Sequence, residues 1–174
     1  MVRVLLDGVG ARSLSDAVAP GLAAAGRAPL QVSAADFLRP AGERYEWGRE
    51  DAGAFRTSWL DAAALDREVL SRGAGYLPAL WDAEADRSAR RRVEPVPPGA
   101  VLLVDGVLLL GRGLPAEVTV HLALSPAALQ RRGVPAWQLP AFVEYDRQAR
   151  PGHVCDVLVR AEDPQRPALL VRRT

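Results

Sequence analysis

The sequence predicts an α/β fold built on a parallel β-sheet. Along its 174 residues, short runs of leucine and β-branched residues alternate with longer segments whose apolar residues recur at helical spacing. Several of the short runs are apolar at every position, which is typical of strands buried between two layers of helices. This alternation indicates βαβ units, and the length suits a single domain over residues 1–174.

Five segments have the composition and boundaries of strands. The first, Val2–Leu6, ends at Asp7-Gly8, a pair that commonly forms turns. The clearest is Val101–Val104, which is apolar throughout and lies between Pro98-Gly99 and Asp105-Gly106. The five expected strands cover 2–6, 29–33, 101–104, 118–124 and 154–159.

Helical segments are expected between these strands. The first contains Leu14, Val18 and Leu22 on one face, and Ser13 or Ser15 is its expected N-cap. Further helices are expected over 51–70, with Ser58 as a cap, from Ser125-Pro126 onward, and in broken form over 135–149.

Residues 71–100 are expected to form a long surface excursion with little regular structure, because glycine and proline interrupt the segment repeatedly. The arginine run Arg90–Arg92 lies within it. We interpret this run as a solvated face rather than as a binding patch.

Composition excludes several classes of function. All 22 basic residues are arginine, so no mechanism can use a lysine side chain. The net charge is only +1 with basic residues scattered, which argues against a nucleic-acid partner. A single cysteine, Cys155, cannot form an internal disulfide, and no apolar run is long enough to span a membrane. The expectation is a cytoplasmic protein without a signal peptide or a membrane partner.

Acidic residues follow three of the expected strands, namely Asp7, Asp36 and Asp105. Ligands of open α/β sheets bind at the carboxyl ends of strands, so these side chains are candidates for a site. The first strand is followed by DGVGARS (7–13) and a helix, the place of a phosphate-binding loop. For Asp7 and Asp105, a simple role in turn formation is the alternative.

Six segments of the chain occur in the order found in a known family. They are DGVGARS (7–13), VSAADFLRP (32–40), ERYEWGRED (43–51), YLPALWDAEADRS (76–88), VLLVDGVLLL (101–110) and DPQRP (163–167). On these motifs the chain resembles the uridine kinase family of P-loop kinases, especially its short actinobacterial members. The resemblance implies a three-layer sandwich of about five parallel strands with helices on both faces.

The resemblance also implies a nucleotide site. Gly8, Gly10, Arg12 and Ser13 would bind the phosphates of ATP, and Ser13 with Asp105 would hold Mg²⁺. A shortened lid-like region over 130–152 would add phosphate contacts from Arg131, Arg132, Arg147 and Arg150.

The substrate implied by the resemblance is nucleoside-like. Asp36 would be the catalytic base, and Arg12 would replace the catalytic lysine. The residues implied in substrate binding are Phe37, Arg44, Tyr45 and Trp81. For the aromatic residues, packing in the core or under the lid is an equal alternative.

The chain departs from the family at the chemistry-bearing positions. A working P-loop reads G-x-x-x-x-G-K-[ST], whereas here Arg12 follows Gly8 by four residues and Ala11 replaces the second glycine. A loop shortened by two residues has two fewer backbone N–H donors for phosphate. The family's base position is Ala35, which accepts no proton. Asp36 could replace it only in an irregular segment, because successive strand residues point to opposite faces.

Three hypotheses for function remain open at this point. The first is a uridine-kinase-like protein with weak or lost phosphotransfer, whose pocket binds a ligand or a partner. The second is an active kinase of a nucleoside or small alcohol that uses ATP and Mg²⁺, with Arg12 and Ser13 at the phosphates. The third is a nucleotide-independent enzyme with Asp36 or Asp105 as acid or base. Only the second requires a cofactor, and assembly into a homo-oligomer is compatible with each.

Two further residues have simple structural interpretations. His121 lies in an apolar strand and is expected to be a hydrogen-bonded core histidine. Cys155 is expected to be a small buried hydrophobic residue, since a metal site would need a second cluster of ligands beside it and His153.

Overall fold

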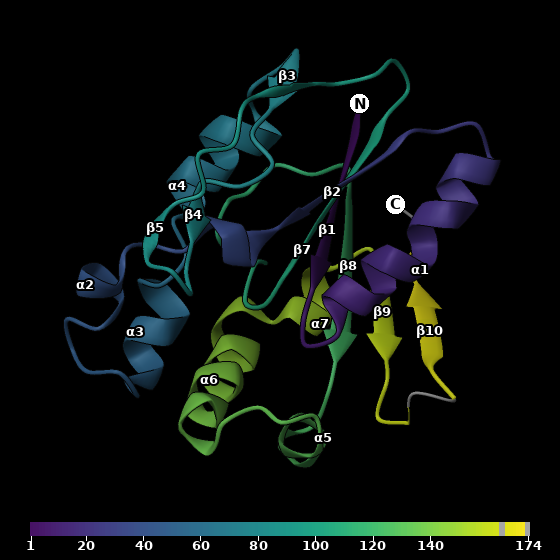
Figure 1. The fold of residues 1–174 in the computed structure, drawn as a ribbon. Helices are drawn as coiled ribbons and strands as arrows, with labels where there is room; N and C mark the ends of the chain where they lie inside the picture. Colours follow the sequence, from purple (N-terminus) through teal and green to yellow (C-terminus); the bar gives the residue numbers. More distant parts are fainter. Residues whose placement is uncertain (164–165, 173–174) are drawn as a thin grey trace.

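A six-stranded sheet forms the centre of the computed structural model, which describes residues 1–163 and 166–172 (Figure 1). The strand order is β10-β9-β8-β1-β7-β2, and every neighbouring pair is parallel except β10 with β9. The strands are β1 (Val2–Asp7), β2 (Pro29–Ser33), β7 (Val101–Gly106), β8 (Val118–Ala123), β9 (Val157–Arg160) and β10 (Ala168–Val171). The α/β class and the five parallel strands predicted from the sequence are confirmed.

The connections between these strands are mostly helical. α1 is the longest helix in the part of the chain that the structure describes. The helices and helical turns are α1 (Ala11–Ala24), η1 (Ala34–Phe37), α2 (Ala41–Arg44), α3 (Ala52–Thr57), α4 (Ala62–Leu65), η2 (Asp66–Leu70), α5 (Pro126–Arg131), η3 (Ala136–Gln138), α6 (Leu139–Ala149) and α7 (Pro151–Val154).

Three predicted boundaries are wrong. α1 begins at Ala11 with Gly10 as its N-cap, so neither predicted serine caps it. In the second helical segment, Asp61 rather than Ser58 accepts the capping hydrogen bond, from the N–H of Ala64. The last predicted strand begins only at Val157, because the proline at the start of α7 favours a helical turn there.

Two short antiparallel pairs give residues 71–100 their regular structure. β3 (Gly75–Tyr76) pairs with β6 (Glu94–Pro95), and β4 (Trp81–Asp82) pairs with β5 (Arg87–Ser88). The remainder of the segment follows the surface beside α2 and α4 (Figure 1).

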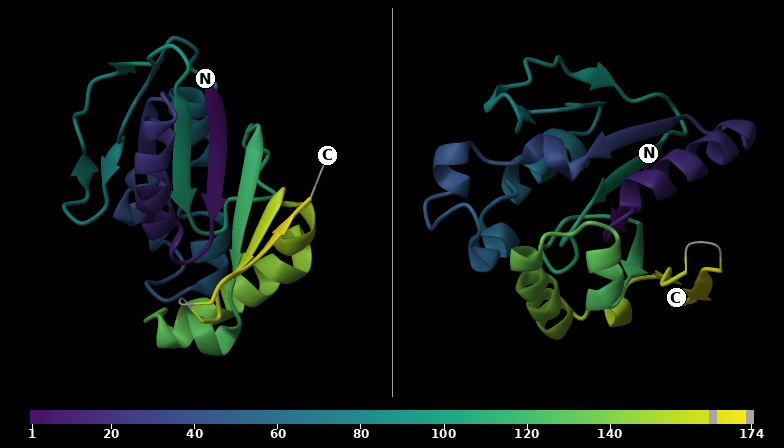
Figure 2. Two further views of the ribbon diagram at one scale, coloured as in Figure 1. Left: turned by 90° about the vertical axis from the view of Figure 1, so that its right-hand side faces the viewer. Right: turned by 60° about the horizontal axis from the view of Figure 1, so that its bottom comes forward.

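Two apolar clusters, one on each face of the sheet, make this a three-layer sandwich. On one face α1 packs over β1, β7 and β8 through Leu6, Leu14, Leu103 and Leu122. On the other face the larger cluster joins the sheet to α4, η2 and α6. Figure 2 shows α1 on one side of the sheet and α6 with α7 on the other. Alternate residues of the central strands are therefore buried against different helices.

The edge strand β10 was not predicted. Its Leu169, Leu170 and Val171 are 68%, 51% and 63% exposed, so it has little of the burial pattern that marks the central strands. It pairs with β9, and Arg172 beyond its end bonds to backbone oxygens of Gly152 and Cys155.

We expect Leu102→Ala to lower the free energy of unfolding by about 2–5 kcal/mol, because Leu102 is fully buried in central strand β7 and its removal leaves a cavity. Leu170→Ala is the matched control on the exposed edge strand and should change stability by less than about 0.5 kcal/mol. Urea unfolding monitored by circular dichroism measures both. Equal losses would contradict this description of the core.

Candidate functional site

The carboxyl ends of β1, β2 and β7 meet at one edge of the sheet, where the predicted acidic residues lie. Asp7 ends β1, and Asp105 is paired in register with Leu6 of β1 and with Ser33 of β2. Asp36 follows β2 in the helical turn η1. The parallel topology therefore gathers residues that are about 30–100 positions apart in the sequence.

The turn between β1 and α1 contains only three residues, Gly8–Gly10. Gly8 and Gly10 have φ of +120° and +98°, a region that favours glycine. A Cβ on Gly8 would lie 2.7 Å from the carbonyl oxygen of Leu122, so the turn passes very close to β8. Its backbone is also internally bonded: the N–H of Gly8 donates to Gly106 and that of Ala11 donates to Gly8, at 2.8 and 3.1 Å.

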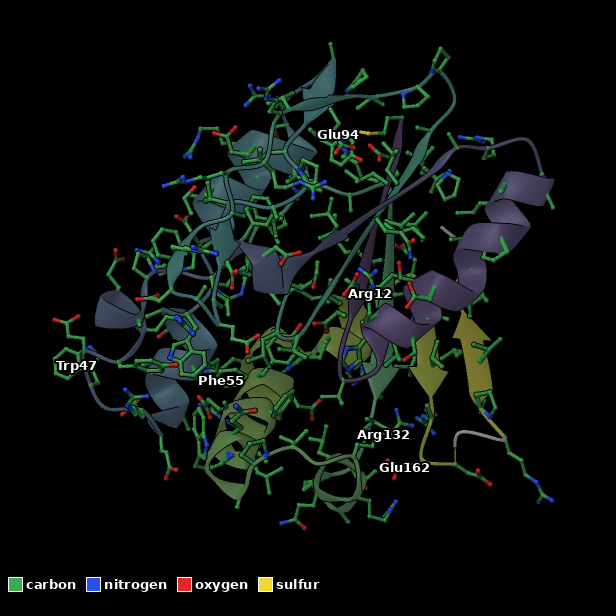
Figure 3. The ribbon with its side chains drawn as sticks, in the orientation of Figure 1. Arg12, Trp47, Phe55, Glu94, Arg132 and Glu162 are labelled. Carbon is green, nitrogen blue, oxygen red and sulfur yellow. The ribbon has the colours of Figure 1, made fainter. Side chains whose placement is uncertain are left out.

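Arg12 lies in the first turn of α1, and its side chain lies beside two carboxylates (Figure 3). Its Nη1 lies 3.6 Å from Oδ2 of Asp105, and its Nε lies 3.3 Å from Oδ1 of Asp16. The Arg12 side chain is half exposed, whereas Asp105 is 3% exposed. Arg12 therefore covers a buried carboxylate from the solvent side.

Asp105 has few other partners. The hydroxyl of Ser33 donates to its Oδ1 at 3.3 Å, while its buried Oδ2 accepts no hydrogen bond from any described residue. Burial raises the pKa of the Asp105 carboxyl, and the positive charge of Arg12 opposes that rise. The ion pair with Arg12 thus supplies the neutralising charge for this carboxylate.

Asp36 shares the electrostatic environment of Arg12. Burial raises the pKa of Asp36, and Arg12 is the largest opposing influence. Residues 34–37 form a 3-10 turn, so the alternation of strand side chains does not apply to Ala35 and Asp36. The irregular segment that a displaced base would require is therefore present.

Arg132 of the lid-like region lies on the other side of the turn. A Cβ on Gly10 would be 3.0 Å from Nη1 of Arg132, and Nη2 of Arg132 donates to the carbonyl of Ala161 at 2.7 Å. Arg131 lies 3.7 Å from Glu162. Arg132 and Arg12 therefore approach the same turn from α5 and α1 (Figure 3). Residues 164–165 of the DPQRP segment lie outside the described residues.

The implied substrate residues occupy different environments. Phe37 has no exposed surface and belongs to the core, so in this structure it is not placed to touch a ligand. Arg44 is also buried: it donates to the carbonyl of Ala83 at 3.1 Å and lies 3.6 Å from Asp86. Trp81 donates from Nε1 to the same aspartate at 3.2 Å. These contacts hold α2 against the β4–β5 pair.

An aromatic cluster joins the lid-like region to α3. Most of its members were not predicted from the sequence. The ring centroid of Phe55 lies 5.2 Å from that of Trp59, 5.7 Å from that of Trp137 and 6.1 Å from that of Phe142. Tyr45 contacts Trp59 edge-on at 5.4 Å. The cluster includes one of the implied substrate residues, which supports the packing alternative for it. The signal available in the sequence was the concentration of aromatic residues at 55–59 and 137–142.

Asp7 is fully buried at the centre of a polar network. Its Oδ1 accepts the N–H of Leu109 at 2.8 Å, and its Oδ2 lies 2.7 Å from Nδ1 of His121 and 2.8 Å from the hydroxyl of Tyr145. The same hydroxyl accepts the N–H of Leu110 at 2.8 Å. Asp7 thus does more than form a turn, and His121 is the hydrogen-bonded buried histidine that the sequence predicted.

Comparison with known proteins bears on the fold. No protein-family model and no curated protein sequence matches the chain. Solved structures do match. A possible uridine kinase from Bacillus stearothermophilus has a TM-score of 0.75 at 16% identity, covering 90% of this chain and 87% of that one. The fold is that of P-loop kinases.

A second structure agrees with the first. It is a candidate fructose transport system kinase from Silicibacter sp. TM1040, with a TM-score of 0.59 at 20% identity, covering 87% of this chain and 81% of that one. At these identities the likeness establishes the P-loop kinase fold and no finer property. Within the described residues, we find no helix with the length and apolar character needed to cross a bilayer.

The contributions of Asp105 and Glu117 to stability should change with pH in opposite directions. Because the pKa of Asp105 is raised on folding, its contribution to stability is present at acid pH and is lost as pH rises through the folded-state value. Asp105→Asn should therefore be more stable than wild type at neutral pH, and the gain should shrink below the usual aspartate pKa.

The matched control is Glu117, whose pKa the hydrogen bonds from Arg3 lower to about 2. Glu117→Gln should lose stability at neutral pH, and this loss should shrink as the pH falls from the usual glutamate pKa of about 4.3 towards 2. Thermal unfolding of both variants from pH 2.5 to 8 measures this. Parallel profiles for the two variants would contradict the assigned environments.

Proposed function

We propose that this chain is a uridine-kinase-like protein in which phosphotransfer is weak or lost, while the site at the carboxyl edge of the sheet still binds a ligand. The observation that carries the proposal is the contact of Arg12, in the first turn of α1, with Asp105 of β7. In this arrangement the residue in the lysine position neutralises the carboxylate in the metal position.

The residues present do not fit Mg²⁺. Magnesium requires near-octahedral oxygen ligands, usually a carboxylate with water and substrate phosphates. Here the buried Oδ2 of Asp105 faces a guanidinium. Among the described residues, no group of three or more acidic, histidine or cysteine side chains is placed to hold a metal ion. We therefore derive no reaction step through a metal.

The turn also fits a triphosphate poorly. Phosphate loops work because several successive N–H groups point at the anion. Here the N–H groups of Gly8 and Ala11 already donate within the protein, and only three residues separate β1 from α1. Arg12 and Arg132 still supply positive charge on the two sides of the turn. A single small anionic group suits this arrangement better than a nucleotide triphosphate.

One observation favours the second candidate, an active kinase of a nucleoside or small alcohol. Asp36 lies in an irregular turn near Arg12, and burial raises its pKa, as expected for a carboxylate acting as a base. This candidate requires Arg12 to leave Asp105 when nucleotide binds.

The decisive measurement is the thermal stability of the protein with ATP or ADP at millimolar concentration, with and without Mg²⁺. A nucleotide at one hundred times its dissociation constant would add about 2.7 kcal/mol of stability. We expect no magnesium-dependent gain, because the cation position is neutralised internally. A magnesium-dependent gain, together with transfer of phosphate to a nucleoside, would overturn the proposal and support the kinase.

A double-mutant cycle tests the contact itself. Arg12→Ala should destabilise the protein at neutral pH, because it leaves the buried Asp105 carboxylate without its compensating charge. The loss should be smaller in the Asp105→Asn background. Arg27→Ala offers a comparison, since within the described residues the Arg27 side chain bonds only to the backbone carbonyl of Gly99. Additive effects of Arg12→Ala and Asp105→Asn on stability would show that the pair does not couple.

A further inference from the structure

A cavity of about 300 Å³ lies beside the network of Asp7, on the β8 side of the turn. The turn, the end of β8, α5 and α6 enclose it, and its walls are largely apolar. Representative lining residues are Val9, Leu122, Leu129, Phe142 and Val143. Its size and apolar character are those of a small-molecule pocket. It lies apart from Arg12 and Asp105, neither of which lines it.

Three polar side chains among the described residues border this cavity. Tyr145 borders it, but its hydroxyl is engaged, since it accepts from Leu110 and donates to Asp7. Asp146 also borders it and is exposed. His121 is the remaining polar side chain among the described lining residues, and only 11% of its side chain is exposed.

The contact with Asp7 determines which ring nitrogen of His121 carries the proton. Asp7 already accepts from Leu109 and Tyr145, and a carboxylate offers only acceptors, so Nδ1 of His121 is the donor at 2.7 Å. In the neutral imidazole, Nε2 is then an acceptor. Because His121 lines the cavity, a ligand that donates to its Nε2 would gain a hydrogen bond there.

We propose that this cavity binds a neutral, largely apolar small molecule through one hydroxyl or N–H group that donates to Nε2 of His121. The walls favour an apolar or aromatic body, and the described lining contains no arginine that could offset the charge of a phosphate. The site goes beyond the proposed function, since it requires neither a nucleotide nor Arg12.

Phenol and anisole are matched probes for this site. Both present an aromatic ring and one oxygen, but only phenol has a proton to donate. With leucine and valine methyl groups labelled for NMR, phenol should give saturable shifts at Leu129 and Val143 and none at Leu170 on β10. Phenol should bind about five times more tightly than anisole, the factor given by a net hydrogen-bond free energy of about 1 kcal/mol.

Two variants assign the binding to the cavity. His121→Phe keeps a ring of similar size and removes the acceptor, so phenol and anisole should then bind equally. Val143→Trp places an indole where Val143 lines the cavity and should abolish the shifts at Leu129; this residue is 55% exposed on α6, so the fold should tolerate the change. Val154→Trp, at a valine 61% exposed and outside the lining, should leave binding unchanged.

Two results would overturn the proposal. Absence of saturable shifts at the cavity methyl groups would show that the cavity is not a site for this class of molecule. Equal binding of phenol and anisole to the wild-type protein would show that His121 is not the acceptor. Neither result depends on ATP or Mg²⁺, so the outcome is separate from that of the nucleotide-binding measurement.

Discussion

The buried carboxylate of Asp7 places the strictest demand on this structure, because a charged group removed from water must find its hydrogen-bond donors inside the protein. The donors come from the loop after β7, from β8 and from α6, through Leu109, His121 and Tyr145. Their convergence fixes the relative positions of three segments at the carboxyl edge of the sheet. The close approach of Gly8 to Leu122 follows from the same geometry, and it allows only glycine there.

The turn held in this way divides the carboxyl edge into two regions of different chemistry. On the β7 side, Arg12 and the carboxylates of Asp36 and Asp105 form a charged region with its own internal neutralisation. On the β8 side, the walls of the cavity are largely apolar, and His121 is one of the polar side chains that border it. In P-loop kinases one continuous loop serves phosphate and metal together. In this chain a three-residue turn joins β1 to α1, and Arg12 and His121 on its two sides have partners within the chain.

Sequence patterns predicted the central strands because burial on both faces leaves an uninterrupted apolar run, as at Val101–Val104. They missed β10, whose side chains are largely exposed and whose pairing is set by the position of β9. The places of Asp7, Asp36 and Asp105 at the carboxyl edge of the sheet could be predicted from their positions after strands. Long-range partners could not be found in the same way, since Tyr145 meets Asp7 across 138 positions of sequence. The resemblance implied Phe37 in substrate binding, with core packing as the equal alternative, and its complete burial favours core packing.

Strand β10 also sets how stability is distributed over the sheet. Because its side chains are already mostly exposed, detaching it from β9 uncovers little new apolar surface and breaks mainly backbone hydrogen bonds and those of Arg172. We therefore expect its amide hydrogens to exchange with solvent through local opening, and those of buried β7 to exchange only through much larger unfolding. The edge of the sheet therefore depends on far less buried apolar surface than the parallel centre does.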